Sequence, residues 1–250
     1  MSIFARFQAI DENRKAAVVR KLMQNGTPDF DFFYLIGLST LMATFGLLLD
    51  SPSIVIGSML IAPLMYPILG VAVGLVMSNW EVFNRSAQTL TNSLMLGLIL
   101  ATVAAFFFGD QSMYLTHEVL SRTEPTYLYL IVAVIAGAAV AYTLAQPEWN
   151  ETLPGIAISV ALIPPLSVVG IGIAALNAEI IKGAVVILLL NIIGIIASAA
   201  ASFMMMNLYR KQDVATATIK REDERVREEE EAIEKITNQK DETQHHDTHA

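Results

Sequence analysis

The apolar residues of this chain form long uncharged blocks, not the alternating or one-sided spacing of a soluble fold. Six stretches without an acidic or basic side chain follow one another, at 32–49, 51–80, 86–109, 125–147, 152–178 and 183–209. At the helical rise per residue, even the shortest could cross about 27 Å of hydrocarbon. The pattern therefore predicts an all-α polytopic membrane protein with six transmembrane helices.

Charged segments flank these blocks and complete the predicted domain organisation. Residues 1–28 are predicted to form an N-terminal cytoplasmic or interfacial helix, and 29–209 the membrane domain. Residues 210–236 are predicted to form a charged cytoplasmic helix, and 237–250 a disordered tail. The charged helix has apolar residues seven positions apart but charged residues between them, which predicts a solvated helix. Self-association, or docking to a cytoplasmic partner, is the alternative.

The distribution of basic residues predicts the orientation in the membrane. Lysines and arginines precede the first block and follow the last, whereas the predicted outer loops carry only Arg122 and Lys182. Basic residues accumulate on the cytoplasmic side, so both termini are predicted there, as six spans allow. In an alternative, the second and fifth blocks are each a re-entrant hairpin of two half-helices, which are 53–62 and 68–78 in the second block. The position of Arg85 distinguishes the two topologies, because Arg85 is cytoplasmic in the six-span topology and external in the hairpin topology.

Composition narrows the chemistry that the chain can perform. There is no cysteine, and of the net charge of −8 most belongs to the tail, so neither disulfides nor substrate charge can be inferred. The apolar blocks hold no ionisable side chain away from their ends, so a carboxylate relay of the kind used by proton-coupled carriers is missing. The histidines of the tail are interpreted as part of a polar segment. The sequence predicts no enzymatic activity, no cofactor, no metal site and no nucleic-acid partner.

The second and fifth blocks carry prolines in similar surroundings, which indicates an internal repeat. Residues 58–63, SMLIAP, align with 159–164, SVALIP. Asn92 and Asn191 lie at similar places in the third and sixth blocks. We therefore predict two three-helix repeats, 30–110 and 125–209. Because three is odd, the second copy would enter the membrane from the opposite side, as an inverted repeat.

Residues 32–75, which contain the pattern SPxxVIGxMLxxPLMxPILG, carry a family resemblance. This run resembles the signature of prokaryotic membrane proteins grouped as domain of unknown function 389, over about residues 30–205. The resemblance implies a location in the prokaryotic cytoplasmic (inner) membrane. It implies no activity and no catalytic residue.

Paired prolines predict broken second and fifth helices, because proline removes a backbone donor and frees a carbonyl one turn earlier. Two such breaks related by the repeat would meet near the midplane, and the two asparagines could face each other there. The predicted pathway residues are Ser58, Pro63, Tyr66, Pro67, Asn92, Ser159, Pro164, Pro165, Ser167 and Asn191.

The sequence therefore predicts a transport protein, channel or carrier, for a small ion or neutral solute. The alternative is a non-transporting scaffold or sensor that acts through its cytoplasmic helices. In that alternative, proline kinks, hydroxyls and amides only join neighbouring helices. The lipid bilayer is the predicted partner in both cases, and a homo-oligomer is left open.

Overall fold

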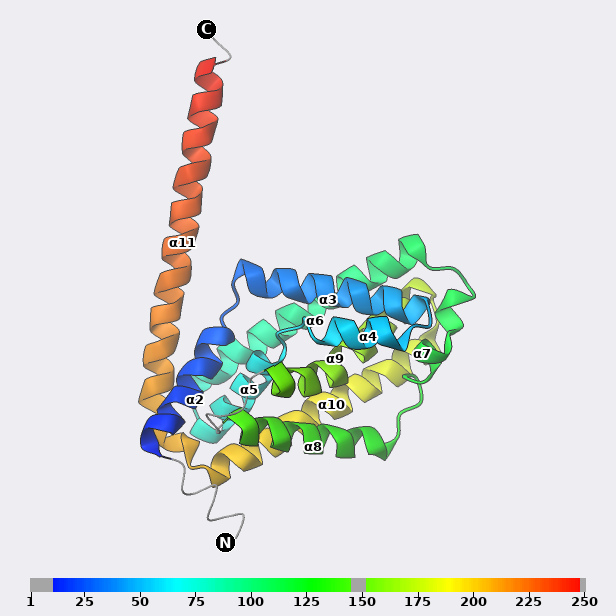
Figure 1. Ribbon diagram of the computed structural model, residues 1–250, viewed down its shortest axis with the longest axis horizontal. Coiled ribbons are helices and arrows are strands. Elements are labelled where there is room, and N and C mark those ends of the chain that lie inside the picture. Colours follow the sequence, from blue (N-terminus) through cyan, green and yellow to red (C-terminus); the bar gives the residue numbers. More distant parts are fainter. Residues whose placement is uncertain (1–10, 145–151, 248–250) are drawn as a thin grey trace.

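The computed structural model describes residues 11–144 and 152–247, and the side chains of these ranges except at 152–160, 230 and 234–247. Every regular element in the described ranges is a helix (Figure 1). In chain order the helices are α2 Glu12–Asn25, α3 Phe30–Leu48, α4 Pro52–Met59, α5 Met65–Met77, α6 Trp80–Phe108, η1 Met113–Leu115, α7 His117–Leu120, α8 Tyr127–Leu144, α9 Thr152–Ala174, α10 Ala178–Met205, η2 Leu208–Lys211 and α11 Gln212–Asp247.

Four of the described helices, α3, α6, α8 and α10, are long and apolar enough to cross a membrane. Two shorter apolar segments accompany them, namely α5 and the described part of α9 from Ala161. Helices suit a bilayer because each satisfies its own backbone hydrogen bonds where no water can. The prediction of an all-α fold with several helices of membrane-spanning length and apolarity is confirmed for the described residues.

Helix α9 lies at the centre of the bundle. It packs against α3, α4, α5, α6, α8 and α10, and residues 161–172 are all buried. The surrounding helices turn large apolar side chains outward, among them Ile99, Ile135 and Leu189, at 57%, 63% and 50% exposure. This is the arrangement expected when lipid, not water, surrounds a bundle.

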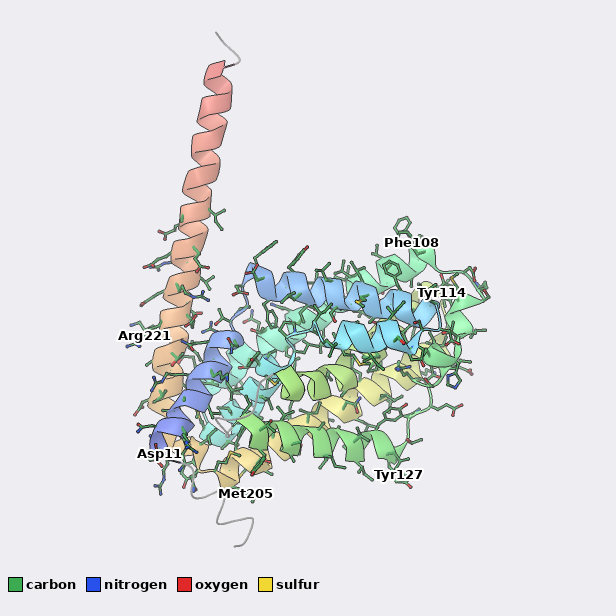
Figure 2. All side chains as sticks on the ribbon, viewed as in Figure 1. Asp11, Phe108, Tyr114, Tyr127, Met205 and Arg221 are labelled. Atoms are coloured by element: carbon green, nitrogen blue, oxygen red, sulfur yellow. The ribbon has the colours of Figure 1, made fainter. Side chains whose placement is uncertain are left out.

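The two ends of the bundle differ. Helices α2 and α11 cover one end, and the segment with α7 covers the other (Figure 1). Figure 2 shows Asp11, Met205 and Arg221 at the first end and Phe108, Tyr114 and Tyr127 at the second. We call the first the terminal end and the second the loop end. At the loop end the Asp50 carboxylate accepts a hydrogen bond from the Glu118 N–H at 2.8 Å, which joins the α3–α4 turn to α7.

The second apolar block is broken, as predicted. Helix α4 ends at Met59 and α5 begins at Met65, and Pro63 lies in the non-helical segment between them, where its missing N–H breaks no helical hydrogen bond. A side chain of α3 stabilises the last turn of α4, because the Ser39 hydroxyl donates a hydrogen bond to the Ser58 carbonyl at 2.7 Å. The Ser58 hydroxyl in turn donates to the Val55 carbonyl at 2.6 Å.

The predicted break in the fifth block is wrong, because α9 continues through Pro164 and Pro165. Pro165 cannot donate to the carbonyl of Ala161, four residues earlier. The side chain of Asn191 replaces that donor, with its Nδ2 2.6 Å from the Ala161 oxygen. A helix can continue past proline when a neighbouring helix satisfies the carbonyl that proline leaves free.

The structure describes the two terminal segments of the predicted domain organisation only in part. Residues 1–10 of the predicted N-terminal helix lie outside the described residues, and α2 forms the remainder. The tail predicted to be disordered from 237 is helical as far as Asp247, and 248–250 lie outside the described residues. Helix α11 therefore extends far beyond the bundle (Figure 1).

An ion-pair network ties α2 to Lys211, the last residue of η2, directly before α11. The Glu12 carboxylate lies 2.8 Å from Lys15 Nζ and 2.9 Å from Lys211 Nζ. Hydrogen bonds from these two ammonium groups, Lys15 first, lower the pKa of Glu12 from 4.5 to about 2. The carboxylate therefore stays ionised in mildly acidic solution, and this link between α2 and Lys211 persists there.

The connections α5–α6 and α9–α10 share one backbone conformation, which the α3–α4 turn also has, with φ of 52° at Asp50 and the Ser51 N–H 2.9 Å from the Gly46 carbonyl. The pair Ser78–Asn79 joins α5 to α6, and Leu176–Asn177 joins α9 to α10. The first residue of each pair is left-handed, with φ of 50° and 53°. The asparagine N–H reaches back to a glycine carbonyl in both, Gly74 at 3.1 Å and Gly172 at 2.9 Å. Each asparagine side chain then caps the next helix. Both turns are the Schellman ending of a helix.

Candidate functional site

A cavity of about 710 Å³ opens at the terminal end of the bundle, beside the break between α4 and α5. We call it the vestibule. Its walls come from the end of α2, the link to α3, the first turns of α3, the break itself, α5 and α11. The lining residues are Gln24, Asn25, Thr27, Asp29, Asp31, Phe32, Leu35, Pro63, Tyr66, Glu222 and Arg225.

Pro63 and Tyr66 form the part of the wall that belongs to the broken block. Their neighbours Ala62, Leu64 and Met65 are buried, at 7%, 1% and 2% exposure. The Tyr66 hydroxyl hydrogen-bonds with the Asn25 side chain at the end of α2. The vestibule thus reaches the broken segment and ends against tightly packed side chains.

The vestibule carries more negative than positive charge. Asp29, Asp31 and Glu222 contribute three carboxylates to the lining, and Arg225 contributes the guanidinium. Arg225 lies 3.0 Å from Glu222 and 4.0 Å from Asp29. It joins α11 to the start of α3 across the vestibule mouth. A concave surface with excess carboxylate raises the local concentration of cations.

Arg85, on α6, fastens α11 to the membrane domain. Its guanidinium lies 2.7 Å from the Asp223 carboxylate, and its side chain is 16% exposed. It also donates to the Ile219 carbonyl at 3.1 Å and to the Thr27 hydroxyl at 3.5 Å. Since α11 supplies two residues of the vestibule wall, Arg85 holds that wall in place.

The predicted pathway residues separate into groups. Pro63 and Tyr66 line the vestibule, and Ser58 and Pro67 are buried in the broken block. The predicted residues Pro164, Pro165, Ser167 and Asn191 are buried in or against α9. The hydroxyl of Ser167 has no hydrogen-bond partner within the described protein. The side chain of Ser159 lies outside the described residues.

The two asparagines predicted to face each other do not do so. Asn191 is 4% exposed and bonded to Ala161, whereas Asn92 is exposed on the outer face of α6. When the two halves are aligned on the matching turns before α6 and α10, Asn79 corresponds to Asn177, which is an offset of 98 residues. That register pairs Asn191 with the buried Ser93, not with Asn92. Aliphatic stretches align equally well at neighbouring offsets, which is why the sequence alone gave the wrong partner.

Sequence reasoning missed the charged part of the site. Asp29 was recognisable only as a helix start, and it does cap α3 by accepting from the Phe32 N–H at 2.9 Å. Glu222 and Arg225 belong to a helix whose charges looked fully solvated. A signal was available in the acidic pair Asp29 and Asp31 directly before an apolar block, opposite a charged helix that contains arginine.

The family model that matches residues 59–197 is described as a domain of unknown function, DUF389. The chain belongs to this family. An uncharacterized protein of Methanocaldococcus jannaschii is 29% identical over 166 residues, which make up 66% of this chain and 51% of the relative. The chain thus spans about half the length of that relative. No solved structure matches the chain.

The matched range starts at the end of α4 and runs into α10. It includes the break, with Pro63 and Tyr66, and the Asn191 that supports α9. It does not include Asp29, Asp31 or Glu222, which contribute the acidic side chains of the vestibule. Membership of DUF389 therefore covers the interior of the candidate site and leaves its charged mouth outside.

Proposed function

We propose that this DUF389 protein transports a small solute, preferentially a cation, across a prokaryotic inner membrane. The observation that carries the proposal is the opening of the acidic vestibule onto a broken apolar block, at Pro63 and Tyr66. Broken helices inside a membrane domain can supply backbone groups to a solute. Non-helical backbone is tolerated at that depth only where it is buried in protein or lines a cavity. The acidic mouth favours a cation over an anion.

The proposed route favours a carrier over an open channel. Beyond Pro63 and Tyr66, a solute would meet the packed side chains of Ala62, Leu64 and Met65. The non-helical segment 60–64 provides a hinge at that point, because its backbone is not fixed by helical hydrogen bonds. The buried hydroxyl of Ser167 on α9, which has no hydrogen-bond partner within the described protein, is a further polar group that a solute could bind.

The proposal includes six crossings. The α4–α5 block and α9 would add two to the four long helices, with both termini on the cytoplasmic side. Two contacts support this. Asp50, before α4, bonds to Glu118 at the loop end, and Arg85, after α5, bonds to α11 at the terminal end. A re-entrant hairpin would bring both ends of the block to the same side.

The two three-helix halves would be an inverted repeat. The shared asparagine cap supports this, because Asn79 and Asn177 each cap the next helix directly after a left-handed residue. Each half also has its prolines in the middle element. From Pro63 to Gly74 the chain advances eleven residues, and from Pro164 to Gly172 only eight. Three extra residues, nearly one helical turn, are what the break in the first half would accommodate.

Cysteine labelling tests the six crossings. The chain has no cysteine, so Glu81→Cys at the terminal end and Glu124→Cys at the loop end, both exposed, can each be probed alone. In intact cells an impermeant maleimide should label Glu124→Cys, and it should reach Glu81→Cys only after permeabilisation. Labelling of Glu81→Cys from outside would support the hairpin and remove the inverted repeat.

Cation flux tests transport itself. In proteoliposomes loaded with a fluorescent indicator, we expect uptake of at least one ion from a panel of K⁺, Na⁺, Mg²⁺ and Ca²⁺. The double change Asp29→Asn with Asp31→Asn should slow it by about threefold, because the mouth loses charge that attracts the cation. Asp110→Asn, which changes an exposed carboxylate at the loop end, is the matched control and should transport normally.

The hinge has its own variant in the same assay. Pro63→Ala restores an N–H and favours continuous helix through the break, so flux should fall several-fold. Pro52→Ala is the control, because Pro52 occupies the first turn of α4, where proline costs no hydrogen bond. Absence of flux for every cation and for a neutral probe such as glycerol would refute transport and favour a scaffold that acts through α11.

A further inference from the structure

The outer face of α6 is polar over the half nearest the terminal end. Asn84, Gln88, Thr91 and Asn92 are all exposed, and their spacing of four, three and one places them on one side of the helix. The other sides of α6 pack against α3, α5 and α9. Nothing in the described part of the chain covers this polar face.

Depth makes this face unusual. Trp80 begins α6 and is 70% exposed, as suits an aromatic residue at the membrane interface. Gln88 and Asn92 follow it by eight and twelve residues, which places them about 12 Å and 18 Å further along the helix axis. The hydrocarbon core is about 30 Å thick, so both amides lie within it. A side-chain amide without a hydrogen-bond partner there costs several kcal/mol.

Neighbouring helices show that the polar face is specific to α6. The exposed side chains of α8 include Leu128, Ile131 and Ile135, and those of α10 include Leu189 and Ile193. These are the residues that lipid tolerates. A bilayer offers an amide neither donor nor acceptor in its core, so lipid is not the matching neighbour for Gln88 and Asn92.

We propose that α6 pairs with α6 of a second copy of this chain through this face. Two copies inserted in the same direction are related by a two-fold axis along the membrane normal, so each residue meets its own counterpart at equal depth. Asparagine and glutamine each carry a donor and an acceptor and can therefore bond to themselves. Interhelical amide bonds of this kind hold membrane helices together.

The spacing continues into an apolar seam. Beyond Asn92 the same face presents Met95 and Ile99, at 58% and 57% exposure. The series Asn84, Gln88, Thr91, Met95 advances by four, three and four residues, the alternation that keeps two parallel helices in contact. Amides would thus set the register of the pair, and the apolar residues would extend its packing. The pairing does not rest on the proposed transport.

Disulfide trapping tests the pairing in native membranes. The absence of cysteine allows Gln88→Cys and Asn92→Cys to be compared with Ile135→Cys on α8 and Leu189→Cys on α10, which are also exposed on the outside of the bundle. Mild oxidation with copper phenanthroline should convert the first two, and not the controls, to a band of two 27.3 kDa chains. Absence of that band, or equal trapping at the controls, would overturn the proposal.

A second measurement covers the case in which cysteine disturbs the face. The double variant Gln88→Leu with Asn92→Leu replaces two amides by apolar side chains that are compatible with lipid. Because both positions are exposed, the fold should persist. In mild detergent, light scattering should report two chains for the wild type and one for the variant. A monomeric wild type, or a variant that stays dimeric, would contradict pairing through these amides.

Discussion

Replacing Asn191 by leucine should destabilise the membrane domain by about 2 kcal/mol. The change removes the donor that lies 2.6 Å from the Ala161 carbonyl. Pro165 cannot donate to that carbonyl, so a buried acceptor is left without a partner. Leucine has the same branched arrangement of side-chain heavy atoms as asparagine but no hydrogen-bonding group, so the substitution leaves no cavity and the lost hydrogen bond dominates the effect. The free energy of unfolding in mild detergent with added denaturant measures it.

A second substitution, combined with Asn191→Leu in a double-mutant cycle, identifies why the stability falls. Pro165→Ala returns an N–H at the position that can donate to Ala161, so the carbonyl no longer needs Asn191. The double variant should therefore recover most of the stability lost by Asn191→Leu alone, with a coupling of about 1–3 kcal/mol. If the two effects simply add, Asn191 supports α9 by packing, and the account given for the unbroken helix fails.

Replacing Arg85 by methionine should release α11 from the bundle. The variant removes the charge that pairs with Asp223 at 2.7 Å and the donor to the Ile219 carbonyl. Loss of a largely buried guanidinium with charge-assisted bonds costs about 2 kcal/mol here, since Asp223 itself is 62% exposed and can be solvated. Amide hydrogen exchange over residues 212–229 should accelerate by about thirtyfold, the equivalent of that free energy.

Arg221→Met is the matched control, because Arg221 lies on the same terminal end with its side chain exposed. Its exchange rates should stay at the wild-type values. If Arg85→Met leaves exchange in α11 unchanged, the helix is held by its other contacts, among them its packing against α2 and the pair of Arg225 with Asp29. The wall that Glu222 and Arg225 give to the vestibule would then not depend on Arg85.

The break in the second block could be predicted because its signal is local. Pro63 and Pro67 lie four residues apart in the apolar block, and proline acts on the carbonyl of its own preceding turn. The fifth block has the same local signal and yet forms one helix. The difference depends on Asn191, which lies on another helix thirty residues away. No local pattern reports whether such a partner arrives at the freed carbonyl.

The acidic vestibule could not be predicted from the sequence either. Asp29 and Glu222 are nearly two hundred residues apart in the chain, and they line one cavity because α11 folds back against α2 and α6, where Asp223 pairs with Arg85. The orientation of Asn92 was hidden for another reason. A shift of one residue turns a helical side chain by about 100°, so an alignment one residue out of register moves an amide from the core to the surface.

By itself, the sequence determined the class of the protein, because uncharged blocks of membrane length leave the backbone no alternative to helices. It also determined the position of the break and the absence of ionisable groups along the blocks. Only the tertiary structure decided which proline-containing element stays helical, where the charges gather and which amides face outward. These depend on hydrogen bonds and ion pairs between distant segments, whose partners are chosen by packing and not by neighbours in the chain.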